Sequence, residues 1–465
     1  MTFVAGIPLI AVIAALLLRQ SALRGALIGA GLAAVIGAIW FDLTPTGAGE
    51  AAGSWWPLVV EVGLIVAGGI AFAEAGRATG AQDQLSGWLR DSLGTGIAPV
   101  LAIVHGVTPL AESLTGFGIG AVLAIPLLTS LGLDGRRSAT IGLVGLCAVP
   151  WGSMGPGTLI AAQLGGVSFN ALGFASGLFS LLVFVGVGLA AALLVAERGQ
   201  RLGACVAAVA SGLGLGVAIL AANAALGTAP AGAVGAFVVL LVHLLISRAR
   251  GGELRWGPEI TRAVLPYLAL LGGVVIASTV VRLTGHSESS WRYLASPALW
   301  LLLATVVGAR GQRQLLGDVS RHTLRTWLPV GPATMMFIVL GVLMSISGMS
   351  GQIAAWLAGL GGTYLVAAPF IAGLGGFITG TNSGANAMFA APQAQTFAAL
   401  GADPLATMAA HNVSAGLLCM ASPARVELAA RLCPDRPRTT PVLRTLLVVD
   451  LLIVAGVTVA LVMVA

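Results

Sequence analysis

The chain has 465 residues, of which 57% are hydrophobic and only 9% are charged, with a formal net charge of +6. Soluble domains average about 25% charged residues, so this composition excludes a soluble protein and predicts an integral protein of the lipid bilayer. All 23 basic residues are arginines. They lie in short loops between apolar runs, which is typical of cytoplasmic membrane loops. The four cysteines fit no metal or redox spacing. We therefore expect no nucleic-acid partner, no metal and no cofactor.

Twelve segments predict membrane-spanning helices, because each holds an apolar run of roughly the 20 residues that a bilayer requires. They lie at 2–18, 25–41, 57–75, 138–166, 168–195, 203–225, 229–247, 262–282, 295–309, 326–346, 404–431 and 443–464. Arginine-rich loops alternate with charge-poor ones, such as the loop from His286 to Arg292, so the positive-inside rule places the N-terminus outside. We expect an all-α polytopic protein, a single membrane domain over 1–465, in the cytoplasmic (inner) membrane of a bacterium.

Two further apolar regions do not fit this count as spans. Region 97–133 begins and ends beside cytoplasmic arginines, whereas region 363–403 begins and ends on the charge-poor side. Each region holds two short apolar stretches around a centre rich in glycine and threonine. The simplest interpretation is two re-entrant hairpins that enter from opposite faces, with tips at Leu114 to Gly118 and at Gly380 to Gly384.

The spans that follow the two hairpins are predicted to be broken helices. Pro150 to Pro156 lies in the middle of span 138–166, and Ser414 to Pro423 lies in the middle of span 404–431. Proline removes an intrahelical hydrogen bond, and glycine lowers helix propensity. Broken backbone at membrane depth is tolerated only where protein buries it or where it lines a cavity.

The two hairpin regions also read as copies of one unit. Their matching stretches are Glu112 to Gly118, Leu131 to Asp134 and Ser153 to Pro156 in the first copy, and Thr379 to Gly384, Leu400 to Asp403 and Met420 to Pro423 in the second. The flanking charges give the copies opposite orientations, which predicts an inverted repeat over 62–166 and 333–431, with scaffold spans in 167–332 and a last span at 443–464. Chance similarity between helices rich in glycine and alanine is the alternative. Paired breaks in matching places point to the binding site of a transporter.

At these residues the chain resembles the L-lactate permease family. Glu112 to Gly118 is similar to the family's Glu-Gly-x-x-Gly-Phe-Gly stretch, and Ile378 to Phe389 is similar to Leu-Thr-Gly-Ser-Asp-Thr-Ser-Ser-Asn-Ala-Leu-Phe. His411 to Gly416 and Met420 to Pro423 are similar to Ala-Asn-Thr-Thr-Gly-Gly and Met-Ile-Ser-Pro. The three motifs keep their order, and the resemblance covers most of the chain.

The resemblance implies a carrier that takes up lactate or glycolate together with protons. It extends to the wider ion-transporter superfamily, whose members are often homodimers with a mobile domain that carries the hairpins. The chain departs from the family at two places. Asn382 stands at the acidic position of the second tip, and Cys419 stands at a basic position, for which the extra Arg425 is a candidate replacement.

The tips and breaks place helix N-termini inside the membrane, where free N–H groups and the helix dipole favour a carboxylate. Glycine lets a ligand approach the backbone, and hydroxyl or amide groups suit a 2-hydroxyl group. Asn386 lies one turn beyond Asn382, on the same helical face. The candidate substrate-binding residues are Thr115, Gly116, Gly118, Ser153, Thr379, Thr381, Asn382, Ser383, Asn386, Asn412, Ser414 and Ser422. The alternative is that these residues only cap the broken helices.

Glu112 is the main candidate for proton coupling, because a carboxylate inside the membrane is costly when charged. His105 lies seven residues earlier on nearly the same helical face and is its candidate partner. The alternative for Glu112 is a carboxylate that accepts hydrogen bonds from the tip amides. His411 is a further coupling candidate. Arg425 either holds an anionic substrate, pairs with Glu427 or reaches toward the inner surface.

The residues and the resemblance together predict a secondary active transporter of a small organic anion. The resemblance implies that this anion is a monocarboxylate, such as L-lactate or glycolate, carried by proton symport. The alternative is a sodium-coupled transporter of a dicarboxylate or another organic anion, which the sodium dependence of uptake distinguishes. A channel would show flux that does not saturate. An enzyme would need a nucleophile or a metal cluster, and the sequence shows neither.

Asp450, inside the last span, is either functional or holds helices together.

Overall fold

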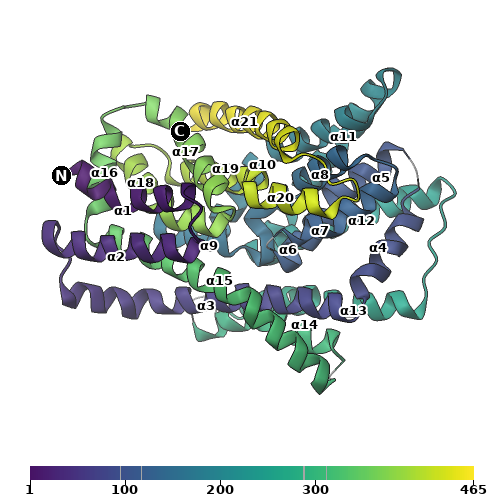
Figure 1. The fold of residues 1–465 in the computed structure, drawn as a ribbon, viewed down its shortest axis with the longest axis horizontal. Helices are drawn as coiled ribbons and strands as arrows, with labels where there is room; N and C mark the ends of the chain where they lie inside the picture. Colours follow the sequence, from purple (N-terminus) through teal and green to yellow (C-terminus); the bar gives the residue numbers. More distant parts are fainter. Residues whose placement is uncertain (95, 117, 286–288, 311) are drawn as a thin grey trace.

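The computed structural model describes residues 1–94, 96–116, 118–285, 289–310 and 312–465, so the tip residue Phe117 and the loop residue His286 lie outside the described part. In that part every regular element is a helix, and there is no strand. Nine of its helices are long and apolar enough to cross a membrane, and one bent pair, Pro404–Ala421 with Pro423–Leu432, makes a tenth. The chain is a multi-pass all-α membrane protein (Figure 1).

Two unusually long helices pack against each other, α3 (Pro45–Ala78) and α15 (Arg313–Ile346). Each has 34 residues, which at 1.5 Å per residue is about 50 Å and exceeds the thickness of a bilayer core. In Figure 1 α3 runs along the lower edge of the molecule, and α15 crosses it diagonally. The N-terminal helices α1 (Thr2–Leu17) and α2 (Ala22–Trp40) pack on each other, and α2 also packs on α15.

The middle of the chain forms five helices that pack mainly on their neighbours in sequence, as short connections require. They are α10 (Phe169–Val195), α11 (Arg201–Leu226), α12 (Thr228–Ala249), α13 (Pro258–Leu283) and α14 (Pro297–Gly308). The pairs α10 with α11, α11 with α12 and α13 with α14 are in contact, and α14 returns to α3. The last helix, α21 (Thr439–Val464), packs on α17, α19 and α10.

The first tip follows a continuous helical stretch. It consists of α5 (Ile97–Ala102), a π-helical turn η1 (Ile103–Val107) and α6 (Thr108–Thr115), and α7 (Ile119–Ser130) follows the tip. Gly116 with φ +72° ends α6, and Gly118 with φ +83° precedes α7. Residues other than glycine rarely adopt such angles, so the two glycines allow the chain to reverse here.

The second tip also reverses the chain at a glycine with positive φ, but a different side chain caps the helix that follows. Gly380, with φ +68°, ends α17 (Thr363–Thr379). Thr381 then caps α18 (Asn382–Leu400), because its Oγ1 accepts a hydrogen bond from the Gly384 amide at 3.1 Å. A threonine hydroxyl at this position satisfies one of the N–H groups that a helix start leaves free.

Both helices that follow the hairpin regions are broken, as the sequence predicts. The first consists of α8 (Gly135–Val144), the 3-10 turn η2 (Val149–Met154) and α9 (Pro156–Gly165). The second consists of α19 (Pro404–Leu418), the 3-10 turn η5 (Cys419–Ala421) and α20 (Pro423–Leu432), and it bends by 45°. In both, a proline begins the second half, where its missing N–H is not needed.

The elements recur in the same order in the two halves. The first half has α3, α4 (Ala81–Ser92), the α5–η1–α6 stretch, α7 and the α8–η2–α9 pair; the second has α15, α16 (Met349–Ala358), α17, α18 and the α19–η5–α20 pair. Two short 3-10 turns, η3 (Arg198–Gln200) and η4 (Ser290–Ala295), lie between the halves. Helices occupy all twelve predicted segments, but α1, α14 and the α8–η2–α9 pair are not among the described helices that are long and apolar enough to cross a membrane. The total of twelve spans with two re-entrant hairpins stays a prediction.

Candidate functional site

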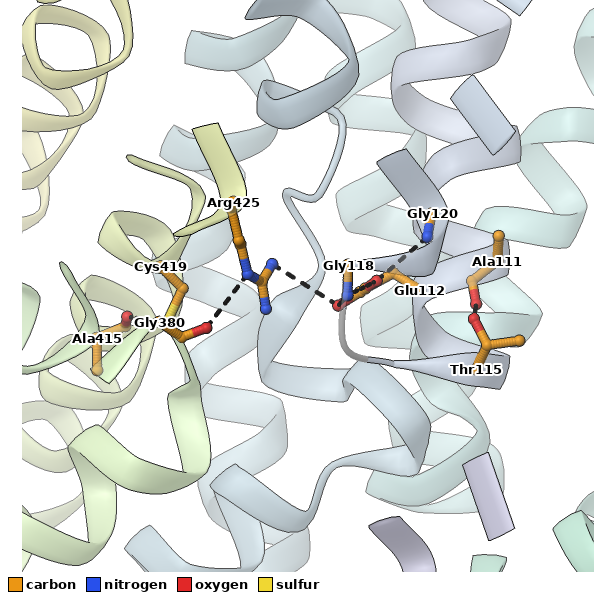
Figure 2. Close-up of polar contacts among 9 residues, drawn as sticks. All are labelled: Ala111, Glu112, Thr115, Gly118, Gly120, Gly380, Ala415, Cys419 and Arg425. Carbon is orange, nitrogen blue, oxygen red and sulfur yellow. Dashed lines mark hydrogen bonds and ion pairs between the residues drawn. The ribbon is translucent and has the colours of Figure 1, made fainter. Parts of the chain in front are cut away.

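Arg425 joins the two tips. It lies in the first turn of α20, directly after the second helix break. Its Nε donates to the Gly380 carbonyl of the second tip at 3.2 Å, and its Nη1 lies 3.9 Å from Oε1 of Glu112 beside the first tip. Figure 2 shows the guanidinium group between Gly380 on one side and Gly118 and Glu112 on the other. The Arg425 side chain is only 11% exposed, so the two tips meet at a buried cation.

Glu112 caps the helix that follows its own tip. Its carboxylate accepts hydrogen bonds from the Gly118 amide at 3.0 and 3.1 Å and from the Gly120 amide at 3.4 Å. These amides lie at the start of α7, where a helix leaves its N–H groups without an intrahelical partner. The carboxylate is buried, and hydrogen bonds to its charged form offset part of that cost. This is the arrangement expected if Glu112 accepts hydrogen bonds from the tip amides; its role in proton coupling stays a prediction.

A buried serine from each broken helix lies beside the glycine of the corresponding tip. A Cβ added to Gly116 would come within 2.7 Å of the Ser153 Cβ, and one added to Gly380 within 3.2 Å of the Ser422 Oγ. Neither serine hydroxyl has a hydrogen-bond partner among the described residues, and neither does Nη1 of Arg425. The tips therefore hold three buried polar groups with unused hydrogen-bond donors.

Ser153 is held in a strained conformation. Its φ and ψ are +45° and +46°, and the next residue, Met154, has φ +66°. A left-handed conformation costs a residue with a side chain about 1–2 kcal/mol. The surrounding packing must maintain it, since Ser153 is 2% exposed and lies against Gly116. Backbone strain of this kind clusters at functional sites.

Three asparagines form a buried carboxamide cluster next to the second tip: Asn382 and Asn386 from α18, and Asn412 from α19. Nδ2 of Asn386 lies within hydrogen-bond distance of three oxygens, the Asn382 Oδ1 at 3.1 Å, the Asn412 Oδ1 at 2.9 Å and the Gly157 carbonyl at 3.0 Å. An amide nitrogen carries two hydrogens, so Asn386 can donate to only two of the three oxygens at once. The Asn412 Oδ1 also accepts from the Asn382 Nδ2 at 3.0 Å. The Asn386 Oδ1 has no partner among the described residues. The predicted shared face of Asn382 and Asn386 is confirmed by their hydrogen bond.

Thr158 and Ser176 complete this cluster, and sequence reasoning missed both. Nδ2 of Asn412 donates to the Thr158 Oγ1 at 2.9 Å and to the Ser176 Oγ at 3.0 Å. Thr158 lies in the first turn of α9, directly after a predicted break, and that position was an available signal. Ser176 lies within the apolar helix α10, where a single serine carries no such signal.

The remaining substrate-binding candidates are mostly engaged with backbone. The Thr115 Oγ1 donates to the Ala111 carbonyl at 2.5 Å, and the Thr379 Oγ1 donates to the Gly375 carbonyl at 2.8 Å. Such bonds back to the preceding turn are common for hydroxyl side chains in helices. Ser383 is half-buried in the first turn of α18, and the buried Ser414 Oγ has no partner among the described residues.

The predicted pairing of His105 with Glu112 is wrong. His105 Nδ1 lies 2.9 Å from the Ser211 Oγ of α11, and its Nε2 donates to the Phe184 carbonyl at 2.9 Å. The carbonyl only accepts, so Nε2 carries the hydrogen and Nδ1 accepts from Ser211. His105 itself lies in the π-helical turn η1, which ends at Val107, before Glu112. Because a π-turn holds an extra residue, the regular helical period no longer places the two side chains on one face.

Three other ionisable candidates take distinct positions. His411 Nδ1 bonds to the Gln393 Oε1 at 2.7 Å, a partner that the sequence did not indicate. Glu427 pairs with Arg431 at 3.0 Å and not with Arg425, so that alternative for Arg425 is wrong. Asp450 is fully buried on α21, and its two carboxyl oxygens have no hydrogen-bond partner among the described residues.

A sizeable cavity lies away from the tips in the described part of the chain. It has a volume of about 840 Å³ and lies where the starts of α5 and α11 face the ends of α7 and α10. None of the candidate residues lines it. In the described part of the chain, no group of three or more His, Cys, Asp or Glu side chains is placed to hold a metal ion.

Comparison with known proteins agrees with the motifs in the sequence. Residues 260–465 match the family model of L-lactate permease. An L-lactate permease of Streptococcus iniae is 24% identical over 337 residues, which cover 66% of this chain and 71% of that protein. An L-lactate permease of Escherichia coli (strain K12) is 32% identical over 94 residues, which cover 20% of this chain and 17% of that protein.

Among solved structures, the YdaH transporter of Alcanivorax borkumensis is similar, with a TM-score of 0.48 and 14% identity, over 89% of this chain and 86% of that one. The family match and the Streptococcus iniae relative both confirm the resemblance stated from the residues. Members of that family are permeases, which move solutes across membranes and are not enzymes. Residues 260–465 of this chain thus match the L-lactate permease family, and the Streptococcus iniae relative extends the similarity over 66% of the chain.

Proposed function

We propose that the chain carries a small monocarboxylate, such as L-lactate or glycolate, together with protons across the cytoplasmic membrane of a bacterium. The observation that carries the proposal is the buried Nη1 of Arg425, which lies between the two tips without a hydrogen-bond partner among the described residues. A planar carboxylate matches the fork of a guanidinium group, because its two oxygens accept two parallel hydrogen bonds. The relatives named L-lactate permeases support the choice of a monocarboxylate.

The substrate carboxylate would bind Arg425 between the tips. The Ser153 and Ser422 hydroxyls would donate to it, since both are buried and unused. Gly116 and Gly380 allow these two serines to lie close to the tip backbone. The free Asn386 Oδ1 would accept a hydrogen bond from a 2-hydroxyl group. The remaining predicted substrate-binding residues would complete this shell.

The architecture behind this site would be an inverted repeat over 62–166 and 333–431. The recurrence of helix order supports the repeat, and the loop charges support its opposite orientations. The hairpins 97–133 and 363–403 would be re-entrant, and alternating access would expose the site to each side in turn. A homodimer, with the scaffold spans of 167–332 at its interface, follows from the family resemblance.

Sodium-coupled transport of a dicarboxylate or another organic anion is the second candidate. The observation that favours it is the carboxamide cluster, because neutral amide and carbonyl oxygens are ligands for hard cations. The oxygens of Asn382, Asn412 and Gly157 converge on one point, the Asn386 Nδ2, at 2.9–3.1 Å. Replacing external sodium by choline would abolish such uptake and leave proton symport unchanged.

The test is uptake of labelled L-lactate into proteoliposomes, with an inward proton gradient and without sodium. Accumulation above the external concentration that collapses with a protonophore supports the proposal. Liposomes without protein are the control. If no gradient drives accumulation, L-lactate is not the substrate, and competition with other organic anions against a sodium gradient would then decide between the two candidates.

A further inference from the structure

The two tips hold one cation and one acid in contact. Among the described residues, Arg425 is the ion-pair partner of Glu112, so the pair is neutral when no substrate is bound. A monocarboxylate that entered this buried region alone would add one uncompensated negative charge. An unpaired buried charge is costly, so the arriving carboxylate requires a compensating positive charge.

The contact between Arg425 and Glu112 is weak enough for a substrate carboxylate to replace Glu112 as the partner of Arg425. At 3.9 Å the Nη1 and Oε1 atoms are too far apart for a hydrogen bond, and Nη1 has no other partner among the described residues. A bound carboxylate would make charge-assisted bonds of about 2.8 Å. The substrate therefore offers Arg425 a closer partner than Glu112 does.

Glu112 has a second set of partners that do not depend on Arg425. Its Oε2 accepts from the Gly118 amide at 3.0 Å and from the Gly120 amide at 3.4 Å. These bonds can persist when the carboxyl group is neutral, because the proton then sits on Oε1, the atom that faces Arg425. A protonated Oε1 would also become a donor toward the carboxylate bound at Arg425.

We propose that Glu112 and the substrate carboxylate compete for Arg425, so that each monocarboxylate binds together with one proton, which Glu112 takes up on Oε1. This inference rests on the proposed transport of a monocarboxylate. In the empty site Arg425 pairs with ionised Glu112. In the loaded site it pairs with the substrate, and Glu112 is neutral. The net charge is zero in both states, so transport is electroneutral.

The other titratable groups near Glu112 have partners of their own or lie near the ends of their helices. The elements packed on α6 are η1, η2, α3, α7, α12 and α13. His105 and His243 both bond to Ser211, Glu61 accepts from Ser296, Glu74 pairs with Arg77, and Tyr267 packs on Phe72. The remaining charged groups on these elements lie near the ends of their helices, at Glu50, Arg248, Glu259, Arg262 and Arg282.

On the side of Arg425, Glu427 and Arg431 form an exposed pair. Cys419 donates to the Ala415 carbonyl at 3.1 Å, and it lies within electrostatic reach of Arg425, Glu112 and Asp450. Asp450 is thus a second buried carboxyl group near the site, and unlike Glu112 it has no cation in ion-pair contact among the described residues. The two carboxyl groups form a matched pair for a test.

The test is titration calorimetry of L-lactate binding to the purified full-length protein, in buffers with different ionisation enthalpies at one pH. The wild type should take up one proton per lactate. Above the pH at which Glu112 in the free protein is ionised, the Kd should rise about tenfold per pH unit. Glu112→Gln should bind lactate with no proton uptake and a Kd independent of pH, and Asp450→Asn should still take up one proton.

Lactate binding without proton uptake in the wild type would overturn the inference and leave transport of the monocarboxylate intact. Proton uptake that survives in Glu112→Gln but is lost in Asp450→Asn would assign the proton to Asp450 and overturn it as well. Absence of lactate binding to the wild type at every pH would instead refute the proposed substrate. If Glu112→Gln fails to fold, wild-type uptake under an imposed potassium diffusion potential decides the matter, since electroneutral transport is insensitive to that potential.

Discussion

The two tips reverse the chain in the same way, but the side chains that cap the following helices differ. Both reverse the chain at a glycine with positive φ, Gly116 and Gly380, and both lie against a serine of a broken helix. The helix after the first tip is capped by the carboxylate of Glu112, and the helix after the second by the hydroxyl of Thr381. A charged cap needs a counter-ion when buried, whereas a neutral cap does not.

Arg425 supplies that counter-ion from the opposite half of the molecule, while its Nε bonds to the Gly380 carbonyl. The charged tip therefore depends on the neutral one. Two similar units can therefore have different roles. The proposed charge exchange takes place at the first tip, and the polar oxygens of the carboxamide cluster lie beside the second. Substitutions at equivalent places in the two tips should have unequal effects.

The largest effect is expected for Arg425→Gln, because it removes the contact between the tips and leaves Glu112 buried without a cation. Breaking a buried pair costs about 3–5 kcal/mol, so lactate uptake in proteoliposomes should fall at least about 100-fold. The matched control is Arg431→Gln on the same helix, since Arg431 is exposed and pairs only with Glu427. Equal uptake by the two variants would exclude Arg425 from the site.

Substitution of the two tip glycines by alanine should have a smaller effect, and the loss of stability should differ between the two positions. A side chain at either positive φ costs about 1–2 kcal/mol. At Gly116 the new Cβ would also approach the Ser153 Cβ to 2.7 Å, whereas at Gly380 the nearest atom is the Ser422 Oγ at 3.2 Å. Gly116→Ala should therefore lower the thermal stability of the purified protein more than Gly380→Ala, by a difference of about 1–3 kcal/mol.

The second mutation Ser153→Gly provides the check on this comparison. It removes the Cβ that the new methyl group meets, and glycine accepts the φ of +45° at that position without strain. The double variant Gly116→Ala with Ser153→Gly should recover part of the lost stability. If the two glycine variants melt at the same temperature, the contact with Ser153 does not limit the first tip.

The positions of the helices and breaks followed from the sequence, because they depend on local properties. Runs of apolar residues give the helices, and Pro150 to Pro156 and Ser422-Pro423 give the breaks. The hydrogen bond between Asn382 and Asn386 also follows from helical spacing alone. Sequence periodicity is sufficient wherever two groups lie on one regular helix.

The contacts between distant segments did not follow from the sequence. His105 was assigned to the face of Glu112 by a helical period that the π-turn η1 interrupts. Ser176 and Gln393 gained their partners through the packing of α10 and α18 on α19, which single-helix spacing does not determine. The sequence left three alternatives open for Arg425, and its contact with Glu112 was not among them, because the bend between η5 and α20 sets the direction of that side chain.

The smallest effect should come from the two serines, and it tests whether the tips face the substrate at all. Ser153→Ala and Ser422→Ala remove buried hydroxyls that have no hydrogen-bond partner among the described residues, so neither change breaks a bond within the described part. Thermal stability should change by less than about 0.5 kcal/mol.

If both hydroxyls donate to the bound carboxylate, each loss costs roughly 1.5 kcal/mol or more, and the Kd for lactate should rise about tenfold. A serine that only fills space would leave the Kd unchanged. An effect at Ser422 alone would place the carboxylate against the second tip, and an effect at Ser153 alone would place it against Glu112.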